Sequence, residues 1–170
     1  SCCNVVQRAA VLSFAIALGL PSVASSQSQI PAGFEDALVA SVPAPTSIAF
    51  TPDGRLLISS QLGQIYIYQQ GALVSVPALD LGTRSCAYRE RSLAGLAVDP
   101  AFASNHFIYA TYTFNKFGNC EAEYTETPVG RLSRFRLEDD NTIDPASEQV
   151  LLDNIPSVIG VHNIGDVKFG

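Results

Sequence analysis

The sequence predicts an all-β protein of the β-propeller class. Three observations support this fold class: short β segments are separated by turn signals, their pattern restarts after about 48 residues, and no helical period follows the N-terminal apolar run. Repeats of ~40–50 residues built from four strands are typical of propeller blades. Apolar residues make up 47% of the 170 residues and charged residues 15%, which is enough apolar material for a packed core.

The first repeat is expected to contain strands over Phe34–Ser41, Ser47–Phe50, Arg55–Ser60, Gln64–Tyr68 and Leu73–Leu81. The segments between them carry turn-forming residues. Thr51-Pro52-Asp53-Gly54 combines proline, aspartate and glycine in the order that favours a tight turn, and Gln70-Gly71 ends the fourth segment.

The second repeat is recognised because its opening copies that of the first. Ser47–Phe50 is followed by Thr51-Pro52, and Gly95–Val98 is followed by Asp99-Pro100. The second group of strands is expected over Gly95–Asp99, His106–Thr113, Gly130–Leu137 and Gln149–Asp153.

A third opening is expected at Gly165–Gly170, after a longer interval of about 70 residues. Two blades and the start of a third cannot close a ring, and such repeats bury their core only against neighbours. We therefore expect residues 27–170 to be the N-terminal part of a longer propeller protein.

The N-terminal segment, residues 1–26, is interpreted as a signal peptide. Arg8 precedes the apolar run Ala9–Leu20, Pro21 follows it, and small residues then offer a cleavage zone near Ala24 or Ser26. A membrane anchor is the alternative, but a run of about a dozen residues is well short of the ~20 that span a bilayer. The expected location is secreted, either periplasmic or extracellular, with no membrane span in the mature chain.

The cysteine count is informative in this context. Cleavage would remove Cys2 and Cys3, which leaves the pair Cys86 and Cys120. An even pair in an exported protein predicts a disulfide, and both residues lie in loops that flank the same pair of strands. Two free buried thiols remain the alternative.

The charge distribution argues against nucleic acid as a partner. The formal net charge is -6, the isoelectric point is about 4.7, and no stripe of lysine and arginine is present. Asp139-Asp140-Asn141 is interpreted as a turn, because it lacks the alternating ligands and closing glutamate of a calcium loop. No metal ligand is assigned in the chain.

Three segments carry a resemblance to a known family. Glu90–Phe102 resembles the motif E-R-G-L-L-G-[IL]-A-x-[DH]-P-x-F, His106–Thr113 resembles an aromatic strand ending Y-Y-T, and His162–Gly170 resembles H-N-G-G-x-[IL]-x-F-G. In this order and spacing, they are similar to the soluble quinoprotein glucose/sorbosone dehydrogenases, which are PQQ-dependent aldose dehydrogenases. The resemblance covers about Phe34 to Gly170.

This resemblance implies a six-bladed propeller that holds PQQ over its central funnel, usually with Ca²⁺. It implies oxidation of the C1 hydroxyl of an aldose to a lactone, with a sugar substrate and an external electron acceptor. His162 matches the motif histidine that takes the hydroxyl proton, and imidazole is a suitable base near pH 7. Glu90 and Asn163 match cofactor-lining positions. The basic residues that clamp PQQ and the calcium loop belong to later blades, so the 170-residue chain alone is expected to be inactive.

His162 and Glu90 each have a structural interpretation as well as a functional one. His162 follows an apolar stretch and could be an ordinary loop histidine, while Glu90 could form a solvated ion pair with Arg89 and Arg91. His106 is interpreted as structural, because it opens a strand. Three other arginines at strand spacing predict a wet sheet face: Arg131, Arg134 and Arg136.

Four residues depart from the family motifs: Ile164, Ser92, Ala94 and Gly130. Ile164 replaces a small residue beside Gly165, which puts the pocket geometry in doubt, whereas the other three are interpreted as tolerable packing changes. Two further functions therefore stay open. One is a non-enzymatic propeller that binds a protein ligand, as hedgehog-interacting proteins do, and the weaker one is a lactonase-like propeller with calcium at its funnel. Fold alone does not decide among them.

Overall fold

The computed structural model describes residues 30–170. The chain divides into two units, Ser1–Ala37 and Leu38–Gly170, and the strands all belong to the second unit. The expected signal peptide, residues 1–26, lies outside the described residues. Within residues 30–170, no helix is long and apolar enough to cross a membrane.

The first sheet contains five strands connected by short turns. They are β1 (Pro45–Phe50), β2 (Leu56–Ser60), β3 (Gln64–Gln69), β4 (Ala72–Leu73) and β5 (Leu79–Asp80), of which β4 and β5 both pair with β3. The two predicted turns are confirmed. Gly54 N donates to Thr51 O at 3.0 Å. Gln70 and Gly71 both have positive φ angles, 50° and 82°, as a two-residue β-hairpin loop requires.

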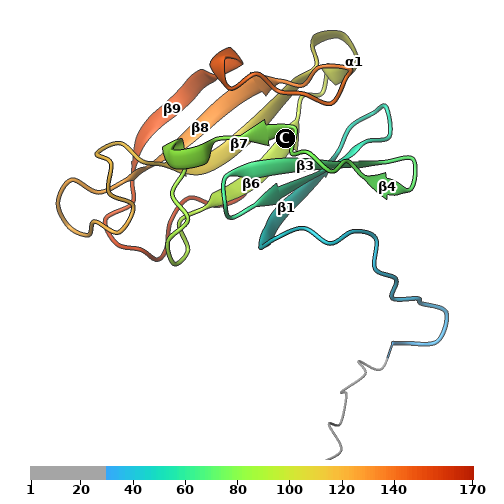
Figure 1. Ribbon diagram of the computed structural model, residues 1–170, viewed down its shortest axis with the longest axis horizontal. Helices are drawn as coiled ribbons and strands as arrows, with labels where there is room; N and C mark the ends of the chain where they lie inside the picture. Colours follow the sequence, from blue (N-terminus) through green and yellow to red (C-terminus); the bar gives the residue numbers. More distant parts are fainter. Residues whose placement is uncertain (1–29) are drawn as a thin grey trace, which may run out of the picture. The chain divides into compact units, whose positions relative to one another are not determined.

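The second sheet contains four antiparallel strands in sequence order, drawn in green to red in Figure 1. They are β6 (Leu93–Val98), β7 (Phe107–Phe114), β8 (Val129–Arg136) and β9 (Gln149–Pro156). The short helix α1 (Phe102–Asn105) connects β6 to β7, and two 3-10 turns lie at Gly82–Arg84 and Pro145–Ser147. Every strand predicted for the second repeat is present, each within a few residues of its expected bounds.

The two sheets repeat one another, as blades of a propeller do. Ser47 pairs with Ser59 in the first sheet, and Gly95 pairs with Thr111 at the corresponding place in the second. The first strands of the two sheets lie side by side, and the hydroxyl of Thr46, on β1, donates to the carbonyl oxygen of Leu93, on β6, at 2.6 Å. The fold is therefore the predicted all-β propeller arrangement over its first two blades.

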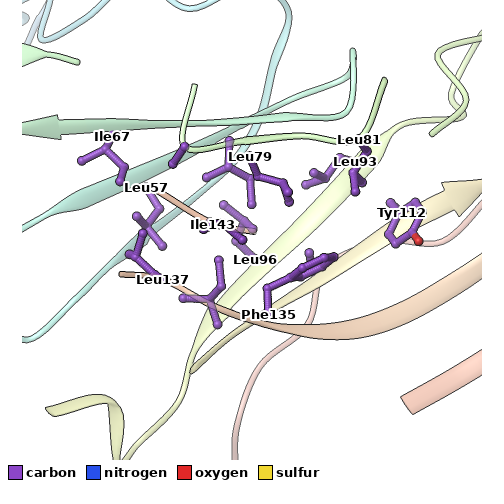
Figure 2. Close-up of a cluster of buried hydrophobic side chains, with 14 of the residues drawn as sticks. Leu57, Ile67, Leu79, Leu81, Leu93, Leu96, Tyr112, Phe135, Leu137 and Ile143 are labelled. Atoms are coloured by element: carbon purple, nitrogen blue, oxygen red, sulfur yellow. The ribbon is translucent and has the colours of Figure 1, made fainter. Parts of the chain in front are cut away.

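The hydrophobic core fills the space between the two sheets (Figure 2). Leu57, Ile67 and Leu79 from the first sheet face Leu96 and Phe135 from the second. Each of these side chains is fully or almost fully buried, and burying one such side chain stabilises the fold by about 1.5–3 kcal/mol. Neither sheet could bury these side chains alone, which explains why the repeat must occur in tandem.

One strand expected in the first repeat is wrong, and another is divided. Phe34–Ser41 forms no strand, and Phe34 and Leu38 are 75% and 87% exposed. Its apolar residues mimic a strand pattern, but a strand needs a hydrogen-bonding partner, and the neighbour of β1 in the described sheet is β2 alone. The single strand expected over Leu73–Leu81 is divided into the short strands β4 and β5.

The third opening, Gly165–Gly170, also forms no strand, yet it lies where a third blade would begin. The hydroxyl of Thr111, on β7, donates to the carbonyl oxygen of Gly165 at 2.5 Å. The rings of Tyr109 and Phe169 meet edge to face at 5.1 Å. A side chain on Gly95 would clash, because its Cβ would lie 2.8 Å from Asp166 Cα. The segment thus packs closely against the second sheet without forming β-strand hydrogen bonds of its own.

Among the charged residues, His106 is structural, as predicted. Its backbone N donates to Phe102 O at 2.9 Å, and its ring stacks on that of Phe102 at 5.4 Å. Asp139-Asp140-Asn141 forms the predicted turn, with Asn141 N donating to Glu138 O.

The prediction that the three strand arginines lie on a solvent-exposed face of the sheet is wrong for Arg131. Its side chain is 11% exposed and forms an ion pair with Asp153 at 2.8 Å.

Candidate functional site

The predicted site residues lie in loops at one end of the two sheets. Glu90 precedes β6, and His162 and Asn163 follow β9. The loop that joins β7 to β8, residues 115–128, lies at the same end, because Tyr124 N donates to Val158 O at 2.8 Å. We call residues 86–92, 115–128 and 157–165 the loop cluster.

Glu90 and His162 contact one another directly. The backbone N of His162 donates to Glu90 Oε2 at 2.7 Å, and Glu90 N donates to Gly160 O at 2.9 Å. His162 has a φ angle of 57°, a left-handed conformation that is uncommon outside glycine, asparagine and aspartate. The side chain of His162 is exposed. The carboxylate of Glu90 therefore holds the backbone of the candidate base and leaves its imidazole free.

The interpretation of Glu90 as an ion-pair partner of its neighbours is not supported. Arg89 pairs instead with Glu123, with 3.1 Å between Nη1 and Oε1. The same Glu123 oxygen accepts from Gly160 N at 3.1 Å. A side chain on Gly160 would meet Arg89 Cδ at 2.7 Å, so glycine permits this close approach.

Arg91 is the residue that sequence reasoning missed. It is fully buried, and its three hydrogen bonds all go to uncharged oxygens. Nε donates to Ser157 Oγ at 3.1 Å, Nη2 donates to Ser157 O at 2.8 Å, and Nη1 donates to Cys120 O at 2.6 Å. Burial lowers the pKa of the Arg91 guanidinium, an effect that the carboxylate of Glu123 partly offsets. One side chain thus connects all three segments of the loop cluster. The arginine in the E-R motif was the available signal, because a motif arginine beside a site is commonly a clamp.

Asn163 belongs to the same hydrogen-bonded group. Its Oδ1 accepts from Ser157 Oγ. Its Nδ2 is buried, and within residues 30–170 no acceptor lies at hydrogen-bond distance from it. A buried donor without a partner costs about 1–3 kcal/mol, and turning the amide over would let Nδ2 donate to Ser157 Oγ instead.

The predicted disulfide is present. Cys86 and Cys120 are bonded to one another across a sequence separation of 34 residues. The bond ties the segment before β6 to the β7–β8 loop, directly beside the contact between Arg91 and Cys120 O. The disulfide and the arginine therefore hold the same two segments together.

Two departures from the family motifs, Gly130 and Ile164, lie close to one another. An atom added as Cβ at Gly130 would lie 3.3 Å from Ile164 Cβ. The larger residue at 164 therefore occupies space that glycine leaves at 130. Whether Ile164 changes the pocket geometry stays a prediction.

Two cavities flank the ends of the sheets. One, of about 290 Å³, is lined within the β7–β8 loop by Phe117, Asn119, Ala122, Glu123, Thr125 and Glu126. The other, of about 270 Å³, lies at the opposite end beside Asp53, Phe102 and His106. Glu123 connects the first cavity to the loop cluster, because it accepts from Gly160 N, two residues before His162.

The described residues contain no group of three or more histidine, cysteine, aspartate or glutamate side chains that could hold a metal ion. PQQ is an anionic quinone, and its oxygens need hydrogen-bond donors and cations. The loop cluster fits part of this requirement with the half-exposed side chain of Arg89, which also pairs with Glu123.

The fold and this loop cluster define the chain as the first blades of a β-propeller whose site would lie at the loop end. The match to a family model shows which protein family the chain belongs to. Residues 42–170 match the model of the Glucose / Sorbosone dehydrogenase family, and the chain belongs to that family. A search of curated proteins found no match.

Solved structures agree with this assignment. A protein described as an oxidoreductase (glucose dehydrogenase) from Thermus thermophilus is 28% identical, with a TM-score of 0.63 over 78% of this chain and 36% of that chain. The PQQ-bound aldose sugar dehydrogenase of Streptomyces coelicolor is 21% identical, with a TM-score of 0.54 over 69% of this chain and 33% of that one. The soluble aldose sugar dehydrogenase of Escherichia coli, in its apo form, is also 21% identical, with a TM-score of 0.53 and coverage of 65% and 30%. The last two similarities concern the fold alone. The chain spans about a third of the length of these proteins.

Proposed function

We propose that this chain supplies the candidate base and one side of the cofactor site of an exported, PQQ-dependent dehydrogenase of aldose sugars. Family membership supports an oxidoreductase of the glucose dehydrogenase type. The observation that carries the finer proposal is the pairing of Glu90 with the backbone of His162, which leaves the imidazole exposed at the loop cluster.

In the proposed reaction, His162 accepts the proton of the C1 hydroxyl of the sugar. The C1 hydrogen leaves as a hydride with its electron pair, and the carbon becomes the carbonyl carbon of a lactone. A bound PQQ would supply the electron-accepting quinone for this hydride, and the electrons would pass on to an external acceptor. Glu90 fixes where the imidazole sits, and Asn163 offers a hydrogen bond at the same site.

Ca²⁺ and the cationic side chains that neutralise PQQ are proposed to come from blades outside these 170 residues, in a six-bladed ring. The chain alone is therefore proposed to be inactive. Export is proposed from residues 1–26, and the Cys86–Cys120 disulfide is compatible with an oxidising compartment.

The test is to express the longest protein that contains this chain, add PQQ and Ca²⁺, and measure dye reduction with a panel of aldoses. We expect activity with at least one sugar and a PQQ-dependent increase in melting temperature. His162→Gln should reduce kcat by about 100-fold or more, the usual contribution of a general base, while PQQ binding persists.

A matched control for that variant lies at the other end of the sheets. Arg136→Gln removes an exposed ion pair with Glu138 and should leave activity unchanged. Absence of both sugar oxidation and a PQQ-dependent thermal shift would reject the enzyme and favour a propeller that binds a protein ligand.

A further inference from the structure

The segment that carries His162 is held by carboxylates from two different loops. From the segment before β6, Glu90 Oε2 accepts from His162 N at 2.7 Å, and Glu90 N donates to Gly160 O at 2.9 Å. From the β7–β8 loop, Glu123 Oε1 accepts from Gly160 N at 3.1 Å. The direction of both carboxylate contacts is fixed, because a backbone N–H donates and a carboxylate oxygen accepts.

Gly160 is packed tightly at this contact. The residue is buried, so its N–H needs an acceptor, and Glu123 provides one. An atom added as Cβ at Gly160 would lie 2.7 Å from Arg89 Cδ and 3.1 Å from Tyr88 Cε1. Gly160 does not have a positive φ angle, so glycine is required here by the close approach and not by the backbone conformation. The contact therefore fixes the backbone just before His162.

Glu123 is itself held in place by its surroundings. Its side chain is 26% exposed, and the same Oε1 accepts from Arg89 Nη1 at 3.1 Å. The next residue, Tyr124, donates through its backbone N to Val158 O at 2.8 Å. The disulfide anchors the same loop. The β7–β8 loop thus holds the segment before His162 from its own side.

His162 has a backbone conformation that needs such support. Its φ angle of 57° is uncommon for residues other than glycine and persists where the surrounding structure enforces it. Its own N–H is held by Glu90, and that of Gly160 is held by Glu123. The Cα–Cβ bond has a fixed orientation relative to the backbone, so these contacts determine the direction in which the exposed imidazole leaves the chain.

We propose that Glu123 is a positioning residue for His162, which acts by accepting the hydrogen bond of Gly160 N. The proposal rests on the proposed function for the role of His162 as the base. Glu123 touches neither sugar nor cofactor in this arrangement. It fixes the backbone from which the imidazole reaches the C1 hydroxyl, and the β7–β8 loop thereby becomes part of the machinery that places the base.

The test measures steady-state kinetics and PQQ affinity in the longest protein that contains this chain, with PQQ, Ca²⁺ and an aldose. Glu123→Ala removes the acceptor of Gly160 N and should lower kcat by about tenfold, because a misplaced catalytic group reacts slowly. KM for the sugar and the affinity for PQQ should change by less than about twofold, since Glu123 contacts neither.

The conservative variant separates the hydrogen bond from the charge. Glu123→Gln keeps an acceptor oxygen for Gly160 N but loses the exposed ion pair with Arg89, so kcat should stay within about twofold of the wild type even if the melting temperature falls. Glu138→Gln is the matched control. It removes an exposed ion pair with Arg136 at the other end of the sheets and should leave kcat unchanged.

Gly160→Ala tests the same contact from the other side. It keeps Glu123 but places a Cβ against Arg89 and Tyr88, so the backbone must shift, and kcat should fall as it does in Glu123→Ala. The proposal is overturned if Glu123→Ala keeps the wild-type kcat. It is also overturned if Glu123→Gln loses as much kcat as Glu123→Ala, or if the loss of kcat is matched by an equal loss of PQQ affinity.

A further readout does not depend on activity. Hydrogen exchange, measured by mass spectrometry on the peptide that contains residues 158–163, should be about tenfold faster in Glu123→Ala than in the wild type. In Glu123→Gln and Glu138→Gln it should be unchanged. Wild-type exchange in Glu123→Ala would show that Glu90 holds the segment alone, and the positioning role would be rejected.

The two proposals fail in different ways. A wild-type protein that neither binds PQQ nor oxidises an aldose removes the proposed function, whereas hydrogen exchange still shows whether Glu123 holds the segment of His162. An active wild type with an equally active Glu123→Ala variant removes the positioning role alone. Should Glu123→Ala not fold, Gly160→Ala decides the question, because a wild-type kcat in that variant contradicts the proposal.

Discussion

Two buried arginines lie at opposite ends of the sheets, and their surroundings differ. Arg55 has a side chain that is 6% exposed and pairs with Asp53 at 2.6 Å, while its Nη1 donates to Glu138 O at 2.9 Å. Arg91 is fully buried and donates only to neutral oxygens. Arg55 closes the turns at one end with a charge partner. Arg91 holds the loop cluster without one.

This difference shows two ways in which the ends of the sheets accommodate a buried arginine. A paired arginine next to solvent costs little to maintain, whereas an unpaired buried cation is expensive and persists where the surrounding structure enforces it. The expensive arginine lies beside the disulfide, the positive-φ His162 and the unpartnered Asn163 amide. The other end also has positive-φ residues, His106 and Asn141, so the contrast concerns only the partners of the two arginines.

The largest effect is expected from removing the disulfide that braces the loop cluster. Replacing Cys86 and Cys120 by serine opens a loop of 34 residues and should lower the free energy of unfolding by about 3–4 kcal/mol. Urea denaturation monitored by circular dichroism measures this loss. A loss near zero would mean that the loop cluster is held by Arg91 and its hydrogen bonds alone.

A smaller effect is expected from replacing each of the two arginines separately by glutamine. Arg91→Gln leaves the buried carbonyl oxygens of Ser157 and Cys120 without donors and should cost about 3 kcal/mol. Arg55→Gln is the matched control and should cost about 1–2 kcal/mol, since the Asp53 side chain that it leaves is 47% exposed and can be hydrated. Equal losses in chemical denaturation would contradict the contrast between the two ends.

The smallest effect is the pH dependence that the pair of Arg55 and Asp53 contributes. Hydrogen bonding to Arg55 lowers the pKa of Asp53 from 3.8 to about 2. The ionised carboxylate is therefore favoured in the folded state. Its contribution is present above pH ~4 and is lost as the pH falls toward about 2. Solvent screening limits the contribution to about 1 kcal/mol.

Thermal unfolding between pH 2 and 5 measures this slope in the wild type and in Asp53→Asn, in which the Asp53 contribution should disappear. Arg91 itself should add no corresponding slope, because no carboxylate oxygen accepts any of its three hydrogen bonds. An unchanged slope in Asp53→Asn would show that other carboxylates produce it.

Much of the fold was accessible from local sequence. The turns at Thr51–Gly54 and Gln70-Gly71 have the residues that their backbone conformations require, and β3 between them alternates as a half-buried strand does. Phe34–Ser41 shows the limit of this reasoning. Its pattern suits a strand, but whether a strand forms depends on a partner that local sequence does not reveal.

The candidate site was accessible only in part. Glu90, His162 and Asn163 were predicted from motifs, and the structure brings all three to one loop cluster, where Glu90 contacts the backbone of His162. Their proposed roles remain predictions. The neighbour Arg91 was interpreted as a solvated ion-pair partner, although it is buried and contacts residues 29 and 66 positions away.

The amino-acid sequence by itself determined the class of fold, the tandem repeat, the pairing of Cys86 with Cys120 and the motif that carries the family. These depend on periodicity, turn chemistry and cysteine count, which act over short stretches of chain. Only the tertiary structure decided that Arg91 is buried, that Ser157 connects it to Asn163, and that Gly130 makes room for Ile164. Burial and hydrogen-bond partners depend on which distant segments meet, and that is settled when the two sheets and their loops pack together.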